Sequence, residues 1–453
     1  MNESCLIKPL LNGRYPSVEY GQGIYLYDSD GKKYIDGSSG AVTAGIGHGV
    51  KEIAAVMKEQ AEKVSFVYRS QFTNKPAEQL ALKLKQWAPG NVNWSFFVNS
   101  GSEATETAMK VAIQYWQEKK RPGKTKILSR WMSYHGITIG ALSMSGHVER
   151  RARFVPLLED FPTVEPPYCY RCSFNNNFPE CHLLCADQLD RAIRRIGSDH
   201  IAAFIAEPII GASGAALVPP PGYYEQIKEI CLSHDILFIA DEVMTGIGRC
   251  GKKFAIDHWQ AVPDIIAAGK GMSAGYAPIA ATIISDEVME PIQNGSKLIM
   301  SGHTYSANPQ SAAIALAVLK YIENHGLISN AAEKGNELLQ KLNQLKQNYP
   351  LIGDVRGMGM LTGVEFVANR GTKQPFSRVI NVTKLIIDKS MEKGLLVYPA
   401  SSGIEGTAGD AVIIAPPLTV RSEEIAELVT VFEEAVKEVQ AELLLRGHLH
   451  SDV

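Results

Sequence analysis

The sequence predicts an α/β protein built on a mainly parallel sheet that is covered by helices. Between about residues 50 and 325, short apolar stretches alternate with longer stretches of helical periodicity, a pattern typical of this fold class. The expected strands cover residues 94–98, 126–128, 201–206, 236–240 and 265–268.

The first element expected along the chain is an antiparallel hairpin. Residues 17–36 alternate apolar and polar positions around Gly31, and the Asp30-Gly31 pair favours a tight turn. A small antiparallel sheet should therefore precede the parallel one.

The last part of the chain has the pattern of a second, smaller α+β domain. We expect helices over residues 331–347, 379–393 and 422–445, and a strand over residues 359–366. Ser422 follows a Pro-Pro pair and precedes two glutamates, which favours a helix start there. We therefore divide the chain into an N-terminal segment (1–55) that packs with the small domain, a large domain (56–325) and the small domain (326–453).

Composition argues for chemistry on small molecules. The 453 residues carry 45 basic and 48 acidic side chains, which gives no electrostatic footprint for nucleic acid or for an anionic membrane. The N-terminus lacks the apolar core of a signal peptide, and the apolar run 201–218 is interrupted by Glu207 and Pro208. Seven cysteines, an odd number, indicate free thiols in a reducing compartment, so we expect a cytoplasmic protein.

Lys270 and Asp241 each end an apolar, strand-like stretch, where an open α/β sheet presents side chains to a ligand crevice. A lysine amine there can form a Schiff base with the aldehyde of pyridoxal phosphate, and a carboxylate can pair with the pyridinium nitrogen. Taken alone, such charges are more often solvated or paired at the surface, so the neighbouring motifs must decide.

Ser100-Gly-Ser-Glu-Ala follows one predicted strand and precedes a helical pattern, so its free N–H groups and hydroxyls could bind a phosphate. Ser100 and Glu103 also have capping-box spacing, and a well-capped helix without a ligand is the alternative. Tyr134, next to His135, could present an aromatic face to a planar ring or be buried. Glu207 ends a buried run, which favours a paired carboxylate or one facing a cleft.

Together these residues carry a family resemblance. The chain resembles the class III aminotransferases of the omega-aminotransferase group, which are fold-type I pyridoxal-phosphate enzymes. The motifs that carry it occur in one order over nearly the whole chain: Asp36-Gly37, Ser100-Gly-Ser-Glu-Ala, Tyr134-His-Gly, Ala206-Glu-Pro, Ala240-Asp-Glu-Val-Met-Thr-Gly-Ile-Gly-Arg, Ala268-Gly-Lys-Gly, Gly302-His-Thr-Tyr and Ala415-Pro-Pro-Leu.

The resemblance implies a fold and a site. The large domain should hold a mainly parallel seven-stranded sheet and bind pyridoxal 5'-phosphate, with Lys270 as the Schiff-base lysine and proton carrier. Asp241 should pair with the ring nitrogen. The other implied cofactor residues are Ser100, Gly101, Ser102, Tyr134, His135, Glu207, Val243 and Thr304, where Val243 packs beneath the ring, Tyr134 stacks above it and Thr304 reaches the phosphate of the neighbouring subunit. Active sites shared across a homodimer, which could pair into a tetramer, are therefore expected.

The implied reaction moves an amino group from a primary amine or ω-amino acid to a 2-oxo acid such as pyruvate. An aminomutase or racemase would use the same cofactor but return the amine to the same carbon skeleton. A phosphate-ligand binding protein, with Ser100-Gly-Ser on a nucleotide phosphate, is the alternative from another class.

Two departures from the family pattern bear on the substrate. Many relatives carry a mobile arginine before the Gly-Asp that precedes Ala-Pro-Pro-Leu, but the stretch 401–410, expected here as a glycine-rich loop, has none. We hypothesise that another cation, or the backbone and hydroxyls of that loop, holds the acceptor carboxylate. After Asp36-Gly37 a large aromatic is frequent in the family, whereas this chain has Ala41-Val42-Thr43, so Val42 and Tyr68 are the expected walls of a roomier substrate pocket.

Four cysteines, Cys169, Cys172, Cys181 and Cys185, have spacings that resemble a metal knuckle, and His182 adds another candidate ligand. The loop between the two pairs is shorter than in usual structural zinc sites. We therefore favour free thiols and expect no metal.

Overall fold

The large sheet predicted from the alternating segments has seven strands in the computed structural model. The structure describes residues 5–449 except 12, 14 and 405. The sheet order is β4 (Val92–Val98), β10 (Ala280–Ser285), β9 (Ile265–Ala268), β8 (Leu237–Glu242), β7 (Ile201–Ala206), β5 (Lys126–Arg130) and β6 (Thr163–Val164). β10 is antiparallel to both of its neighbours, and the other neighbouring pairs are parallel. The mainly parallel seven-stranded sheet is therefore confirmed.

Two strands of this sheet lie outside the expected ones. β10 reads as a short apolar run, and such a run does not by itself distinguish a strand from a buried helix segment. β6 has only two residues, too few for any periodicity. Both strands are stabilised by pairing with partners far away in the sequence.

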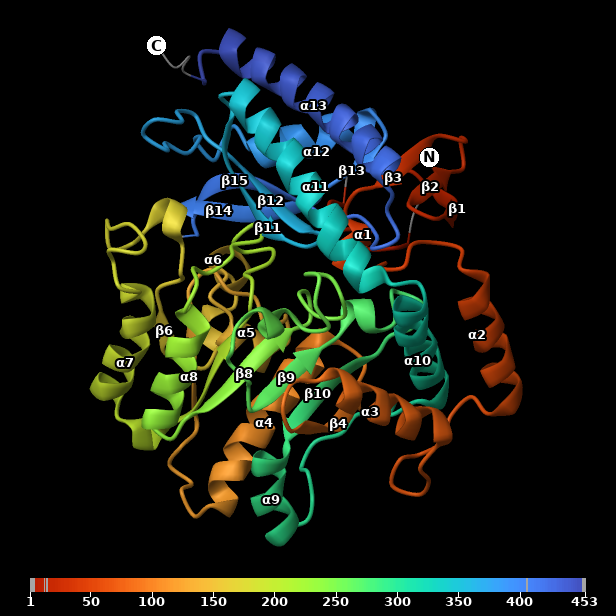
Figure 1. Cartoon of the computed structure of the whole chain (residues 1–453), viewed down its shortest axis with the longest axis vertical. Coiled ribbons are helices and arrows are strands. Elements are labelled where there is room, and N and C mark those ends of the chain that lie inside the picture. Colours follow the sequence, from red (N-terminus) through yellow and green to blue (C-terminus); the bar gives the residue numbers. More distant parts are fainter. Residues whose placement is uncertain (1–4, 12, 14, 405, 450–453) are drawn as a thin grey trace.

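Helices cover both faces of the large sheet (Figure 1). Side chains alternate along β8, where Ile239 packs with α4 and α9 on one face and Phe238 packs with α8 on the other. The helices around the sheet are α2 (Lys51–Lys63), α3 (Lys75–Trp87), α4 (Gly101–Glu118), α7 (Leu184–Ile196), α8 (Tyr223–Ser233), α9 (Asp286–Asn294) and α10 (Pro309–Asn324).

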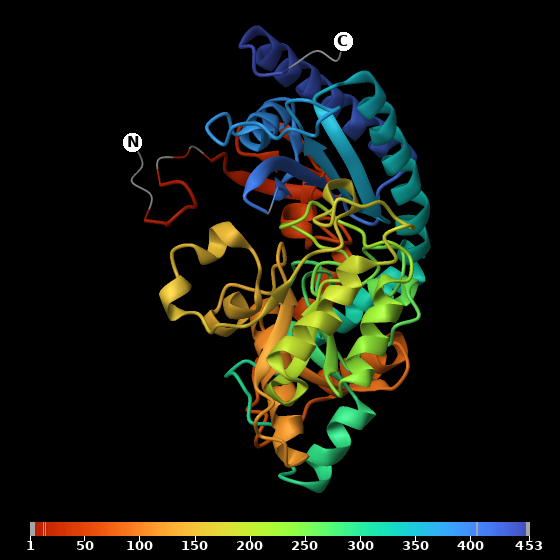
Figure 2. The same ribbon diagram turned by 90° about the vertical axis from the view of Figure 1, so that its left-hand side faces the viewer.

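Two four-stranded sheets lie at one end of the large sheet, as Figures 1 and 2 show from two sides. One contains β1 (Val18–Gln22), β2 (Tyr25–Asp28), β3 (Lys33–Asp36) and β13 (Leu395–Leu396). The predicted hairpin is the antiparallel pair β2 and β3, with Gly31 at φ +80° in its turn. Because β13 pairs in parallel with β3, N-terminal and C-terminal segments share this sheet.

The other small sheet is antiparallel and has the order β11-β12-β15-β14. Its strands cover Ile352–Met358, Leu361–Phe366, Ala408–Ile414 and Tyr398–Ile404, and α11 (Leu327–Asn348), α12 (Val382–Glu392) and α13 (Ser422–Leu445) accompany it. The three predicted C-terminal helices are present, with α11 beginning earlier and α12 later than expected. The domain boundaries at residues 55 and 325 stay predictions.

The prediction of a glycine-rich loop over residues 401–410 is wrong. Most of this stretch belongs to β14 and β15, in which Ser401 lies opposite Asp410 and Ile404 lies opposite Ala408. Gly403 at φ +90° and Gly409 lie so close to the opposite backbone that a Cβ on either would be within 2.3 Å of a carbonyl oxygen. Glycines that permit close strand approach conceal the alternation by which a strand is recognised in a sequence.

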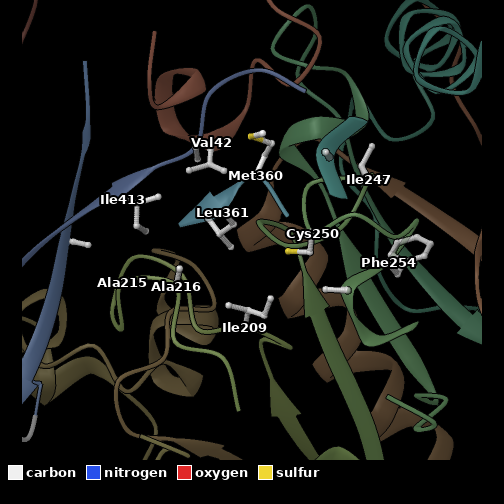
Figure 3. Packing of buried hydrophobic residues seen from close by; sticks show 14 of the residues in the cluster. Val42, Ile209, Ala215, Ala216, Ile247, Cys250, Phe254, Met360, Leu361 and Ile413 are labelled. Atoms are coloured by element: carbon white, nitrogen blue, oxygen red, sulfur yellow. The ribbon is translucent and has the colours of Figure 1, made fainter. Parts of the chain in front are cut away.

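A continuous apolar core joins the large sheet to the small ones. Figure 3 shows residues from segments far apart in the sequence, among them Val42, Ile209, Cys250, Leu361 and Ile413, packed in one cluster. This packing orients the carboxyl edge of the large sheet against β14 and β15. The site described below lies at that edge.

Short elements complete the described chain: α1 (Ser39–Val42), α5 (Ile139–Met144), α6 (Val148–Arg151) and five 3-10 turns, η1 (Val155–Leu157), η2 (Cys169–Arg171), η3 (Ser198–His200), η4 (Ala255–His258) and η5 (Lys270–Met272). In the described part of the chain, no helix has both the length and the apolar character needed to span a bilayer.

Candidate active site

Lys270 and Asp241 line one cavity of about 180 Å³ at the carboxyl edge of the large sheet. Asp241 lies near the end of β8, and Lys270 follows the neighbouring strand β9 after a single glycine. The remaining lining residues are Gly101, Ser102, Tyr134, His135, Gly136, Glu207, Ala212, Val243 and Met244. Each of them follows the end of β4, β5, β7 or β8, and the ends of the strands are where an open α/β sheet binds its ligands.

The carboxylate of Asp241 is buried and held in place by two partners. Its Oδ2 lies 2.7 Å from His135 Nδ1, and its Oδ1 accepts a hydrogen bond from the Val243 N–H at 3.1 Å. His135 is itself fixed, because its N–H donates to Ser145 Oγ and its carbonyl accepts from Thr105 Oγ1. Since each carboxylate oxygen can accept two hydrogen bonds, Asp241 keeps capacity for another donor.

The Lys270 amine lies in an environment that disfavours its positive charge. Burial lowers the pKa of Lys270 to about 8, although Asp241 and Glu207 act in the opposite direction. Its backbone is left-handed, at φ +40°, which is uncommon for a residue other than glycine. A neutral amine is therefore available near physiological pH, as a nucleophile or a proton acceptor requires.

The turn between β4 and α4 has the features of an anion cradle. Ser100 caps α4, with its Oγ accepting the Glu103 N–H at 3.3 Å, while the N–H groups of Gly101 and Ser102 have no acceptor within the helix. The Glu103 side chain accepts from the N–H of Asn99 rather than of Ser100, so the expected capping box is displaced by one residue. Ser102 Oγ accepts from the Ile137 N–H at 3.0 Å and can still donate its own hydrogen.

Two glycines keep this cradle open. A Cβ on Gly101 would lie 2.7 Å from Val243 Cγ1, and a Cβ on Gly136, at φ +135°, would lie 2.5 Å from Ser102 Oγ. Neither position therefore accepts a side chain without displacing a lining residue. Val243 packs directly against the Ser100-Gly101 turn.

Glu207 lines the cavity, but its carboxylate is used to hold backbone. Oε1 accepts the Tyr134 N–H and Oε2 accepts the Gly211 N–H, both at 2.7 Å. Burial raises the pKa of Glu207, and these two bonds oppose that shift. Glu207 therefore positions two parts of the cavity lining, Tyr134 and the Gly211-Ala212 turn.

Four predicted site residues do not line this cavity, and one of them, Ser100, lies beside it as the cap of α4. Val42 is 2% exposed and packs in the apolar core, whereas Tyr68 is 51% exposed. Thr304 is exposed in the segment between α9 and α10. Their roles in binding substrate or a neighbouring subunit's cofactor stay predictions.

Sequence reasoning did not single out Gly136, Ala212 and Met244, which line the cavity. The signal for Gly136 was available, because it completes Tyr134-His-Gly and supports a positive φ. Ala212 and Met244 carry no chemical signal of their own.

The four clustered cysteines line a separate small cavity under η2. Cys169 is exposed, Cys172 is intermediate, and Cys181 and Cys185 are buried; all are free thiols. Burial raises the pKa of Cys169 and Cys185, which disfavours the thiolate forms that ligate metals. Among the described residues, no group of three or more His, Cys, Asp or Glu side chains has the arrangement to hold a metal ion.

Comparison with known proteins identifies the family. The model of aminotransferase class III matches residues 13–436. An uncharacterized aminotransferase of Bacillus subtilis (strain 168), YodT, is 56% identical over 441 residues, which are 97% of this chain and 99% of that protein. The putrescine–pyruvate aminotransferase of Pseudomonas aeruginosa is 32% identical over 94% of this chain and 91% of its own length.

Solved structures agree with this assignment. An (S)-enantioselective omega-transaminase from Thermomicrobium roseum superposes with a TM-score of 0.90 at 34% identity, covering 97% of this chain and 96% of that one. The omega transaminase of Pseudomonas jessenii in complex with PMP gives a TM-score of 0.89 at 34% identity, over 94% and 93% of the two chains. The chain belongs to the class III aminotransferases, and it is therefore an enzyme of the transaminase type whose family uses pyridoxal phosphate.

The side chains that line the cavity have the chemical groups needed to bind this cofactor. It combines an amine of lowered pKa, a buried carboxylate, an aromatic side chain and an anion cradle whose glycines leave no room for a Cβ. One buried nitrogen, His135 Nε2, also has no hydrogen-bond partner among the described groups.

Proposed function

We propose that this aminotransferase moves an amino group from a primary amine or ω-amino acid to a 2-oxo acid such as pyruvate, in two half-reactions of a ping-pong cycle. The observation that carries the proposal is the Lys270 amine, with a pKa near 8, in one cavity with the buried Asp241–His135 pair. The similarity to a putrescine–pyruvate aminotransferase and to omega-transaminases supports this choice of substrates.

When bound, pyridoxal phosphate supplies an aldehyde that takes up the amino group and a ring that accepts the electron pair of the substrate carbon. Lys270 would hold the cofactor and, once released, its neutral Nζ would take the proton from the substrate carbon and deliver it again. Asp241 would hold a proton on the ring nitrogen, with His135 keeping the carboxylate oriented. Ser100, Gly101 and Ser102 would bind the phosphate, and Val243 and Tyr134 would enclose the ring.

A panel of amines tests the reaction. Each amine is incubated with the holoenzyme and either pyruvate or 2-oxoglutarate, and the amino acid formed from the 2-oxo acid is measured. Appearance of alanine or glutamate shows exchange between two different carbon skeletons, which an aminomutase or racemase does not perform. Absence of exchange for every pair, with rearrangement of a single amino acid instead, would contradict the proposal.

We also propose a homodimer with shared active sites, in which Thr304 of one subunit reaches the cofactor phosphate of the other. The exposed position of Thr304, outside the cavity of its own chain, supports this arrangement.

A subunit-mixing experiment tests the shared site. The inactive variants Lys270→Ala and Thr304→Ala are unfolded and refolded together, which forms mixed dimers that contain one intact site. Activity should appear only after mixing. If Thr304→Ala alone keeps wild-type cofactor affinity, the proposed role of Thr304 is wrong.

A further inference from the structure

A second cavity of about 630 Å³ adjoins the one that contains Lys270. Ala212 lines both cavities, so they meet at the Gly211-Ala212 turn. Its walls come from α6, from the segment before α12, and from β14 and β15, and they include Arg150, Arg378, Ser401, Ser402 and Asp410. In Figure 2 the gold segment that contains α6 projects from the body beside these strands.

Arg150 lines the second cavity and also contacts a residue that lines the first. Its guanidinium lies over the Tyr134 ring, 4.7 Å from the ring centroid, and Tyr134 is a wall of the Lys270 cavity. The positive charge of Arg150 also lowers the pKa of Lys270, in the same direction as burial does. A group bound to Arg150 would therefore lie close to the reacting centre.

The other charged groups of the second cavity already have partners in the described part of the chain. Arg378 pairs with Glu149 at 2.9 Å, and Asp410 Oδ1 accepts from Thr383 N–H and Oγ1 at 2.8 and 3.0 Å. His147, edge-on to the Tyr134 ring, is neutral at physiological pH because burial lowers its pKa to about 4.

Arg150, by contrast, forms no ion pair or hydrogen bond with any group in the described part of the chain. A second unused group is the Ser402 hydroxyl, which is buried at 1% exposure and lacks a hydrogen-bond partner among the described residues. A guanidinium and a hydroxyl donor in one cavity match the two oxygens of a carboxylate.

We propose that Arg150 is the carboxylate-binding residue of this enzyme, and that it holds the carboxylate of a substrate in the second cavity with Ser402 as a further donor. The proposal rests on the aminotransferase function proposed above. β14 and β15 contain no arginine that could bind a carboxylate. The proposal assigns this role to Arg150 of α6 instead. The carboxylate can belong to an ω-amino acid donor or to the 2-oxo acid acceptor, and the two half-reactions distinguish these sources.

The kinetic test compares matched substrates in separate half-reactions, followed by the cofactor's absorbance. The donor pair is 4-aminobutyrate and n-butylamine, and the acceptor pair is pyruvate and propanal. Arg150→Gln should lower kcat/KM about 10- to 100-fold for a carboxylate-bearing member, the range for losing a hydrogen bond between charged groups, and leave the neutral member within about twofold. Arg150→Lys should lose less, because it keeps the charge but not the planar fork. The control is Arg153→Gln, a change at an exposed arginine three residues further along. It should leave kcat/KM unchanged for both the carboxylate-bearing and the neutral member of each pair.

A binding test is independent of turnover. Glutarate, a dicarboxylate without a transferable amine or carbonyl, is titrated into the holoenzyme by calorimetry. The Arg150→Gln enzyme should bind it at least tenfold more weakly than wild type and Arg153→Gln. Equal glutarate affinity in the two variants would overturn the proposal, and so would an equal loss for charged and neutral substrates, which would leave Arg150 only a support for Tyr134. If no amine is transferred but glutarate binding depends on Arg150, the proposed reaction fails while the carboxylate site stands.

Discussion

Replacing Glu207 with glutamine tests the idea that this carboxylate organises the cavity through backbone. Both of its oxygens accept an N–H at 2.7 Å, from Tyr134 and from Gly211. Glutamine has one carbonyl oxygen and one NH₂ group, so one backbone N–H would face another donor inside the protein. The change is nearly isosteric and isolates the hydrogen bonds from packing.

The expected cost follows from those two bonds. Loss of one hydrogen bond to a charged acceptor costs about 1.5–3 kcal/mol, and the remaining bond weakens because its acceptor is no longer charged. Burial raises the pKa of Glu207, so relief from burying a charge offsets part of the loss. We expect a net local destabilisation of about 2–3 kcal/mol.

Hydrogen exchange measures this quantity at the site. A loss of about 2–3 kcal/mol corresponds to exchange that is roughly 30- to 150-fold faster at the amides of Tyr134 and Gly211, if they open locally. The control is Glu106→Gln, because a single Glu106 oxygen accepts one N–H, from Ala141 at 3.2 Å, and glutamine can replace it. Unchanged protection of both amides in Glu207→Gln would refute the reasoning.

Other predictions concern the cofactor. With a pKa near 8, the Lys270 amine becomes neutral as pH rises, so the rate at which cofactor-free protein takes up pyridoxal phosphate should rise through about pH 8 and then level off. Asp241→Asn should move this inflection to lower pH, since Asp241 raises the pKa of Lys270; an inflection at higher pH would contradict the electrostatic assignment. Gly136→Ala should weaken cofactor binding by more than about tenfold in an absorbance titration, because its Cβ would lie 2.5 Å from Ser102 Oγ, whereas Gly371→Ala, with its nearest contact at 3.5 Å, should bind normally.

Much of the site could be predicted because its residues follow recognisable strand ends. Lys270, Asp241, Glu207 and the Ser100 turn each end an apolar run, and parallel strands bring such ends to one edge. Their partners could not be predicted in the same way. The Asp241–His135 contact joins residues separated by 106 positions and depends on how β5 and β8 are placed in the sheet.

Prediction failed where local pattern and tertiary environment disagree. The stretch 401–410 resembled a loop because its glycines interrupt the strand alternation, yet it pairs as β14 and β15. Val42, predicted to line a substrate pocket, is 2% exposed in the core that joins the sheets and does not line the Lys270 cavity, so its role in binding substrate stays a prediction. Solvent exposure depends on what packs over a residue, and that is not encoded next to it.

The sequence by itself determined the fold class, the cofactor chemistry and the residues that could perform it, because strand ends, helix starts and reactive side chains are local features. Only the tertiary structure decided that Glu207 holds backbone at the cavity and that Arg150, rather than a residue of β14 or β15, brings its guanidinium to Tyr134. These assignments depend on distances between segments that are remote along the chain. Such distances follow from how the sheets and their shared core pack together.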